Sequence, residues 1–201
     1  MTILKMFPTI AYKGHIDIPD SVIDSYKQER YHACSPENYY MSNGKMTSPG
    51  KHKDKNYMPL ISLIDEHVEK YLDYVKINKK LKCCGAWINL HTEKDFVQQH
   101  FHPNAMVSGI VYIDAPDGSA PLKFHANPSM NHMFGPFFGH DMAKLAEISF
   151  PVETGDILLY PSTILHSVPP NTKPINRYSF AFDYMVDGTI DTYVNKTKIL
   201  V

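Results

Sequence analysis

Residues 98–114 read QQHFHPNAMVSGIVYID, and the interpretation of the whole chain starts from this stretch. Two histidines, His100 and His102, flank one phenylalanine just before an apolar run that is rich in strand-forming residues. In an extended chain, side chains two residues apart project from the same face. Both imidazoles can therefore share one metal ion, and neutral imidazole suits Fe, Zn, Cu and Ni.

A third candidate ligand follows in GDILLYPSTILHSVPP, residues 155–170. Here a Gly-Asp turn leads into an apolar strand, and His166 comes after a Pro-Ser turn and before a Pro-Pro stop. A histidine in this place can complete a metal site with the earlier pair. Taken alone, it is more typical of an ordinary core or surface histidine.

Arginine and hydroxyl side chains share one strand face in NRYSFAFDYM, residues 176–185. The aromatic residues alternate with Arg177, Ser179, Ala181 and Asp183, so the aromatic face predicts a core contact. An arginine on the inner face of a barrel needs an anionic partner, because burying the charge unpaired is costly. Arg177 beside Ser179 therefore predicts a carboxylate clamp, unless this face is exposed and Arg177 is a surface charge.

Tyr112 shares a face of its predicted strand with Ser108 and Ile110. Its phenolic hydroxyl can add a contact to the same carboxylate. The alternative is a tyrosine that simply fills the core.

The remaining pattern predicts one helix followed by many short strands. Pro59 suits a first helical position, and apolar residues recur at helical spacing at Ile61, Ile64, Val68, Leu72 and Val75. From residue 84 onward the segments are short, β-branched or aromatic, and separated by turn-forming residues. The predicted fold class is mainly β with helices (α+β), a jelly-roll-like sandwich or open barrel backed by the helix.

Length and composition restrict the class of protein. The 201 residues carry a formal net charge of −1 and 43% hydrophobic residues, which suits one globular domain and does not indicate a nucleic-acid partner. We expect a single domain over 1–201, with an N-terminal part (1–80) and a β core (84–201). No apolar run is long enough to span a membrane, and no signal peptide is evident. Three cysteines make no disulfide framework, so we expect a soluble, cytoplasmic protein.

Two segments carry no readable motif. Residues 27–58 are polar, aromatic and rich in turn formers, so we expect a long irregular excursion there. Residues 126–148 combine Met, Phe and Gly, a composition that suits a flexible apolar lid or an equally apolar packed loop. Both segments are expected to shape a substrate pocket, and the pattern leaves the oligomeric state open.

The order of these motifs resembles the 2-oxoglutarate- and Fe(II)-dependent dioxygenases. The similar branch has W-x-N, then H-x-H-P with S-G-x-Y-Y, then G-x-L-x-x-F-P-S with H-x-V, then R-x-S-x-A-F-N. The matching segments here are WIN (87–89), HFHPNAMVSGIVYI (100–113), GDILLYPSTILHSV (155–168) and RYSFAF (177–182). The resemblance covers residues 87–201 and implies a double-stranded β-helix that holds iron at one open end.

By this resemblance, His100 takes the place of the first iron ligand and His166 that of the distal histidine. The superfamily usually has a carboxylate two residues after the first histidine, whereas this chain has His102. Either the site has three histidines, or a carboxylate arrives from elsewhere, or iron is not bound productively.

The resemblance also implies a site for the cosubstrate. Arg177 matches the residue that pairs with the far carboxylate of 2-oxoglutarate, Ser179 and Tyr112 match its supporting hydroxyls, and Asn89 matches a polar residue lining that pocket. The implied activity is decarboxylation of 2-oxoglutarate with Fe(II) and O₂, coupled to oxidation, by hydroxylation, of an unidentified small-molecule or peptide substrate. Two alternatives stay open: a three-histidine cupin-like dioxygenase that uses no 2-oxo acid, and a non-catalytic metal-binding β-sandwich module.

Overall fold

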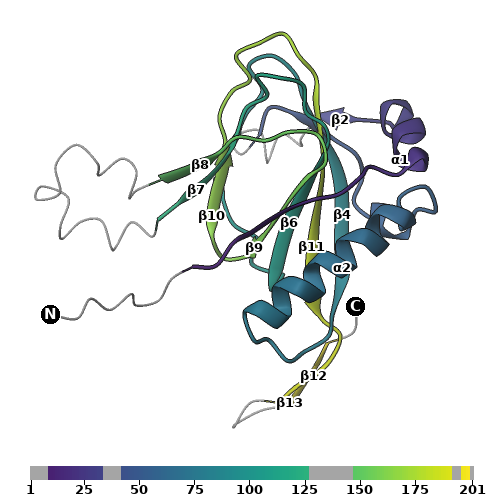
Figure 1. Ribbon diagram of the computed structural model, residues 1–201, viewed down its shortest axis with the longest axis vertical. Helices are drawn as coiled ribbons and strands as arrows, with labels where there is room; N and C mark the ends of the chain where they lie inside the picture. The colour runs from purple at the N-terminus through teal and green to yellow at the C-terminus, as the bar shows by residue number, and fades with distance from the viewer. Residues whose placement is uncertain (1–8, 34–41, 127–146, 192–195, 200–201) are drawn as a thin grey trace, which may run out of the picture.

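The computed structural model of the chain describes residues 9–33, 42–126, 147–191 and 196–199. Within these residues, two antiparallel β-sheets face each other, and the longest helix lies across the outer face of the larger sheet (Figure 1). The predicted fold class, mainly β with helices in a jelly-roll arrangement, is confirmed.

All helical segments of the described residues lie before residue 75, and the elements from Leu81 onward are strands. The helical segments are α1 (Asp20–Ser25), η1 (Tyr26–Gln28), η3 (Lys51–Lys53) and α2 (Met58–Tyr74). The strands are β1 (Tyr12–His15), β2 (His32–Ala33), β3 (Lys45–Met46), β4 (Leu81–His91), β5 (Val97–His100), β6 (Val107–Asp114), β7 (Leu122–His125), β8 (Glu147–Phe150), β9 (Asp156–Pro161), β10 (Leu165–Val168), β11 (Arg177–Val186), β12 (Gly188–Asp191) and β13 (Lys196–Ile199).

The larger sheet has the strand order β1-β9-β6-β11-β4-β3-β2, and the smaller sheet has the order β5-β10-β7-β8. A separate hairpin of β12 and β13 follows the long strand β11 (Figure 1). Strand β11 pairs with β6 on one side and with β4 on the other. Its residues therefore lie near the centre of the larger sheet, where both faces are covered.

One core lies between α2 and the larger sheet. The helix presents Ile64 and Val68 to this core, where they are buried in one cluster with the aromatic residues of β11 such as Phe180 and Phe182. The predicted aromatic core face of β11 is thus confirmed. Gly109 of β6 lets the strands approach, since a Cβ there would lie 2.5 Å from ring atoms of Phe182.

A second core lies between the two sheets. It includes Ile110 and Tyr112 from β6, Leu158 and Tyr160 from β9, and Phe124 from β7. Because β6 is covered on both faces, seven of its eight residues are buried. The inner faces of β6 and β11 therefore face the space between the two sheets, and these inner faces carry several of the candidate site residues.

The excursion expected over residues 27–58 is less irregular than its composition suggests. Within the described part of it, β2 pairs with β3, and β3 extends the larger sheet beside β4. Two-residue strands leave no detectable period-2 pattern, which is why the sequence did not predict them.

The lid expected over residues 126–148 stays a prediction, because only Ala126, Glu147 and Ile148 of that segment belong to the described residues. The division of the chain into an N-terminal part (1–80) and a β core (84–201) also stays a prediction. Among the helices of the described ranges, none has the length and apolarity needed to cross a membrane.

Candidate metal centre

Three histidines meet at one end of the space between the sheets. His100 ends β5 and lies directly opposite His166 of β10 in the strand register, while His102 follows two residues later. One ligand nitrogen from each lies within 4.8 Å of the other two. His102 lies beyond the end of β5 rather than in the extended strand that its spacing suggested, because the chain turns at Pro103. The paired imidazoles nevertheless converge.

The hydrogen bonds of the three rings fix which nitrogen of each is free. Nδ1 of His100 donates to the carbonyl of Gln98 at 2.9 Å, and Nδ1 of His166 donates to the carbonyl of Ile164 at 3.1 Å. Carbonyl oxygens can only accept, so both Nδ1 atoms carry the proton. Both Nε2 atoms therefore present a lone pair.

Nδ1 of His102 donates a hydrogen bond to Oδ1 of Asp183 at 2.7 Å. Nε2 of His102 is thereby left with a lone pair and lies only 3.3 Å from Nε2 of His100. Two imidazole nitrogens bound at about 2.1 Å to one ion, at tetrahedral or octahedral angles, lie roughly 3.0–3.4 Å apart. The three histidines thus fit a single metal ion, and their donor set suits Fe, Zn, Cu or Ni.

Burial keeps the ligand nitrogens unprotonated. It lowers the pKa of His166 to about 3, with a further contribution from the nearby His100 ring. Burial also lowers the pKa of His100. Near neutral pH both rings are therefore neutral, which is the form that binds a metal.

A second group of polar side chains lies between the sheets. Arg177, Ser179 and Tyr112 are all completely buried, and Ser179 lies opposite Tyr112 in the register of β11 and β6. The guanidinium carbon of Arg177 lies 5.6 Å from the centre of the Tyr112 ring. Three of their polar atoms have no hydrogen-bond partner among the described residues: Nε of Arg177, Oγ of Ser179 and Oη of Tyr112. Buried polar atoms without partners are rare in proteins and indicate a missing ligand.

The guanidinium of Arg177 has neutral partners where an anion was expected. Nη1 donates to the carbonyl of Ala120 at 2.7 Å, and Nη2 donates to Nδ1 of His91 at 2.5 Å. Burial lowers the pKa of Arg177, and burial together with the adjacent guanidinium lowers that of His91 well below its ordinary value. Among the described residues, no carboxylate contacts Arg177, so the anion that the sequence predicts has a place to bind.

Asn89, the remaining predicted pocket residue, lies on β4 in register with Ser179 of β11 and is partly buried. His91 follows it on the same strand face, and this residue was not predicted as part of the site. The alternation along β4 contained the signal, because residues 89 and 91 share a face.

Strand β11 connects the two groups. Arg177, Ser179, Ala181 and Asp183 alternate along its inner face, with Arg177 at the polar cluster and Asp183 at His102. Tyr160 lies between the groups, with its ring centre 5.0 Å from that of His166. One face of β11 therefore carries residues of both groups.

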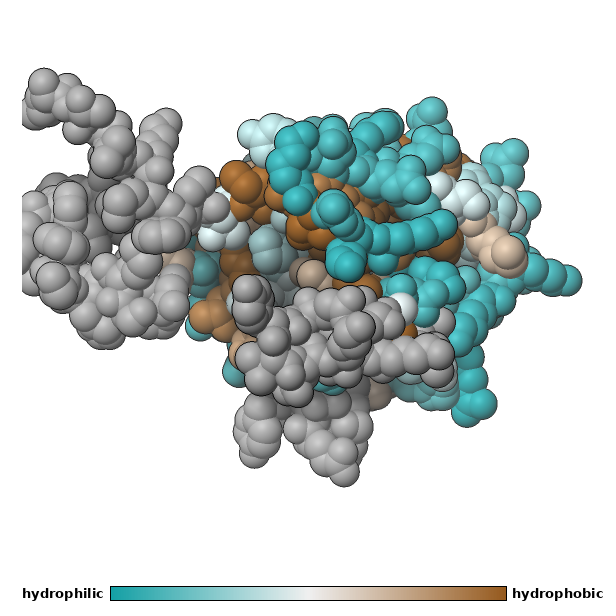
Figure 2. All heavy atoms as spheres, turned by 90° about the horizontal axis from the view of Figure 1, so that it is seen from below, coloured by the Kyte–Doolittle hydropathy of each residue, from teal (hydrophilic) through white to brown (hydrophobic). Residues whose placement is uncertain are grey.

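A cavity of about 990 Å³ lies outside the metal centre. Its wall includes Phe101, Met106, Phe124 and Ile164, and the carbonyl of Ile164 accepts the hydrogen bond of His166. Phe101 and Met106 are 48% and 37% exposed. Figure 2 shows apolar side chains gathered among polar ones on the lower face of the molecule.

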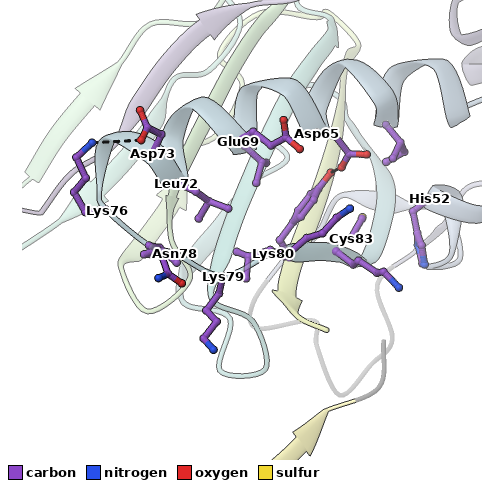
Figure 3. A pocket seen from close by; sticks show the side chains of 16 residues that line it. His52, Asp65, Glu69, Leu72, Asp73, Lys76, Asn78, Lys79, Lys80 and Cys83 are labelled. Atoms are coloured by element: carbon purple, nitrogen blue, oxygen red, sulfur yellow. Dashed lines mark hydrogen bonds and ion pairs between the residues drawn. The ribbon is translucent and has the colours of Figure 1, made fainter. Parts of the chain in front are cut away.

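Another cavity, of about 1000 Å³, lies on the opposite side of the larger sheet, between α2 and the start of β4 (Figure 3). Asp65 and Glu69 of α2 line it together with lysines of the following turn. None of the candidate metal or polar-cluster residues contributes to it.

Comparisons with known proteins agree with this geometry. Residues 85–183 match the family described as "Putative 2OG-Fe(II) oxygenase". Curated protein sequences include no match to the chain.

Solved structures share the fold at low sequence identity. A prolyl-4-hydroxylase from Pseudomonas putida superposes with a TM-score of 0.62 at 12% identity, over 90% of this chain and 94% of that one. The non-heme alpha ketoglutarate dependent epimerase SnoN from nogalamycin biosynthesis superposes with a TM-score of 0.65 at 12% sequence identity, over 92% of this chain and 82% of that one. HygX from Streptomyces hygroscopicus, solved with nickel, 2-oxoglutarate and hygromycin B, superposes with a TM-score of 0.58 at 14% sequence identity, over 89% of this chain and 83% of that one.

Proposed function

Through residues 85–183 the chain belongs to the 2-oxoglutarate- and Fe(II)-dependent oxygenase superfamily, and we propose that it hydroxylates a prime substrate while decarboxylating 2-oxoglutarate. The cofactors are those of the family: Fe(II), 2-oxoglutarate and O₂. In the proposed reaction, 2-oxoglutarate, O₂ and a C–H bond yield succinate, CO₂ and an alcohol. When bound, Fe(II) supplies the centre at which O₂ is reduced.

His100, His102 and His166 would hold the ion through their Nε2 atoms. Three protein ligands would leave room at the ion for further ligands. The protein's own contribution is geometric, because hydrogen bonds from all three Nδ1 atoms hold the rings in their orientation before the metal arrives.

The observation that carries the cosubstrate proposal is the set of three buried polar atoms without partners on Arg177, Ser179 and Tyr112. The distal carboxylate of 2-oxoglutarate would accept from all three groups at once. It would also supply the negative charge that a fully buried guanidinium requires. A dioxygenase without a 2-oxo acid, or a non-catalytic module, gives this buried arginine no function.

The prime substrate is proposed to be a small molecule or a peptide that enters beside Phe101 and Met106. Phe101 lies between His100 and His102 in the sequence, and Met106 follows four residues after His102. Both apolar side chains are partly exposed and line the cavity there. Both a prolyl-4-hydroxylase and an epimerase share the fold, and we propose hydroxylation as the outcome for this chain. We also propose a cytoplasmic location, which agrees with the free thiols of Cys83 and Cys84.

The test is anaerobic absorption spectroscopy of the purified protein. We expect a visible band that appears only when Fe(II) and 2-oxoglutarate are both present, because the 2-oxo acid then chelates the metal. Admission of air should release succinate from 2-oxoglutarate, which is measured by mass spectrometry. A protein that binds Fe(II) but gives neither the band nor succinate would be a three-histidine protein of another class.

A further inference from the structure

Asp183 of β11 stands behind the metal centre and is not one of its ligands. Its Oδ1 lies 2.7 Å from Nδ1 of His102, on the side of the ring away from His100. Among the described residues, no other carboxylate contacts any of the three histidines. We propose that Asp183 is a positioning residue that supplies, through His102, the negative charge that the three-histidine centre lacks. This inference rests on the proposed function.

Several contacts besides Asp183 hold His102 in place. Its backbone N–H donates to the carbonyl of Ser162 at 2.8 Å, and its ring centre lies 5.8 Å from the ring centre of Trp87. Ser108, which is completely buried, donates from Oγ to the same Oδ1 of Asp183 at 2.6 Å. The carboxylate is thus fixed by a buried hydroxyl while it orients the imidazole.

The chemistry of the three Nδ1 contacts differs in charge. His100 and His166 donate to neutral carbonyls, whereas His102 donates to a carboxylate. A carboxylate on Nδ1–H raises the electron density at Nε2 and makes the imidazole a stronger ligand. His102 is then a more electron-rich ligand than His100 and His166.

The carboxylate contact of His102 is important because of the place that His102 occupies in the sequence. A centre with two histidines and one carboxylate is one charge less positive than a centre with three neutral histidines. His102 occupies the place where the usual triad has the carboxylate, and it is the histidine that contacts Asp183. The side chains of His102 and Asp183 are only 15% and 18% exposed, so water screens this charge weakly. The negative charge of Asp183 therefore lies behind the ligand His102, whereas in the usual triad it lies on the ligand itself.

A purely structural role makes a different prediction. If Asp183 only anchors the turn after His100, any hydrogen-bond acceptor of the same shape will do. Asp183→Asn keeps the shape and an amide oxygen for Nδ1–H, but removes the charge. Asp65→Asn is the matched control, because Asp65 accepts a hydrogen bond at 2.5 Å from Tyr184, the next residue of β11, on the other side of the sheet (Figure 3).

The experiment measures Co(II) affinity by anaerobic absorption titration of the parent protein and both variants. We expect Asp183→Asn to bind Co(II) about 10- to 100-fold more weakly, with an unchanged thermal midpoint in the absence of metal. Asp65→Asn should bind Co(II) as the parent does. In the iron-loaded proteins, the Fe(III)/Fe(II) reduction potential of Asp183→Asn should be more positive than that of the parent. A negative charge stabilises the ferric form, so removing the charge favours the ferrous form. Equal Co(II) affinity and equal potential in the parent and Asp183→Asn would overturn the proposal.

A measurement on the parent alone keeps the inference falsifiable if Asp183→Asn does not fold. Long-range ¹H–¹⁵N correlation spectra of the Zn(II)-loaded protein report the tautomer of each imidazole. We expect His102 with a protonated Nδ1 and metal on Nε2, and the opposite tautomer would refute the role of Asp183. The proposed function fails separately, if the parent binds no Co(II) or if His166→Ala binds it as tightly as the parent.

Discussion

Replacing Arg177 by methionine should separate cosubstrate binding from folding. Arg177 is completely buried, and its guanidinium is held by the carbonyl of Ala120 and by Nδ1 of His91. Removing it leaves these two acceptors without a donor, at a cost of about 1–3 kcal/mol each. The substitution also removes a buried charge without an anionic partner, which returns several kcal/mol of desolvation. The two effects oppose each other, so the ligand-free variant should be about as stable as the parent.

The loss appears when 2-oxoglutarate is added. Removing one partner of a buried, charge-assisted contact costs about 2–5 kcal/mol, or roughly 30- to several-thousand-fold in affinity. At a 2-oxoglutarate concentration of about 100 times its Kd, the parent gains about 2.7 kcal/mol. Each kcal/mol raises the thermal midpoint of a domain of this size by about 2–4 °C. We therefore expect a rise of about 5–10 °C for the parent and of less than about 3 °C for Arg177→Met.

Thermal unfolding with Mn(II), in the presence and absence of 2-oxoglutarate, measures both quantities. The matched control is Arg30→Met, because Arg30 is exposed and is the only other arginine of the sequence. It should respond to 2-oxoglutarate as the parent does. An equal rise in the thermal midpoint for Arg177→Met and the parent would refute the assignment of Arg177 to the cosubstrate.

Three further outcomes are expected. Tyr112→Phe and Ser179→Ala each remove a buried hydroxyl without a partner, so in urea denaturation the ligand-free variants should be as stable as the parent or more so, while calorimetry should show 2-oxoglutarate bound about 5- to 15-fold more weakly. His166→Ala should lose the roughly one Fe(II) per chain that metal analysis of the parent should find. His91, whose pKa is held well below its ordinary value by burial and by Arg177, stays neutral in the folded protein while the unfolded chain takes up a proton below about pH 6.5. Stability should therefore fall as pH decreases from about 6.5, by about 1.4 kcal/mol per pH unit for this proton, and His91→Gln should reduce that slope in urea titrations at pH 7 and pH 5.

Elements with a local sequence pattern were predictable without the structure. The helical spacing around Ile64 and Val68 predicted α2, and the alternation of Arg177 and Ser179 with aromatic residues predicted which face of β11 enters the core. Such periodicities follow from the backbone geometry of a single helix or strand, so they can be read without knowing the partner. The order of the histidine and arginine motifs likewise indicated the family.

What the sequence could not determine is which side chains meet across strands. Asp183 lies 81 residues from His102 and His91 lies 86 residues from Arg177, and no local pattern records either contact. Strand register decides the second contact, because pairing β11 with β4 places His91 beside Arg177. The first contact depends on how the two sheets face each other, because His102 follows β5 of the smaller sheet while Asp183 lies on β11 of the larger one. Only the folded chain shows that Arg177 is buried with no carboxylate contact among the described residues, and that the carboxylate of Asp183 lies behind His102. Local periodicity carries no signal for either arrangement.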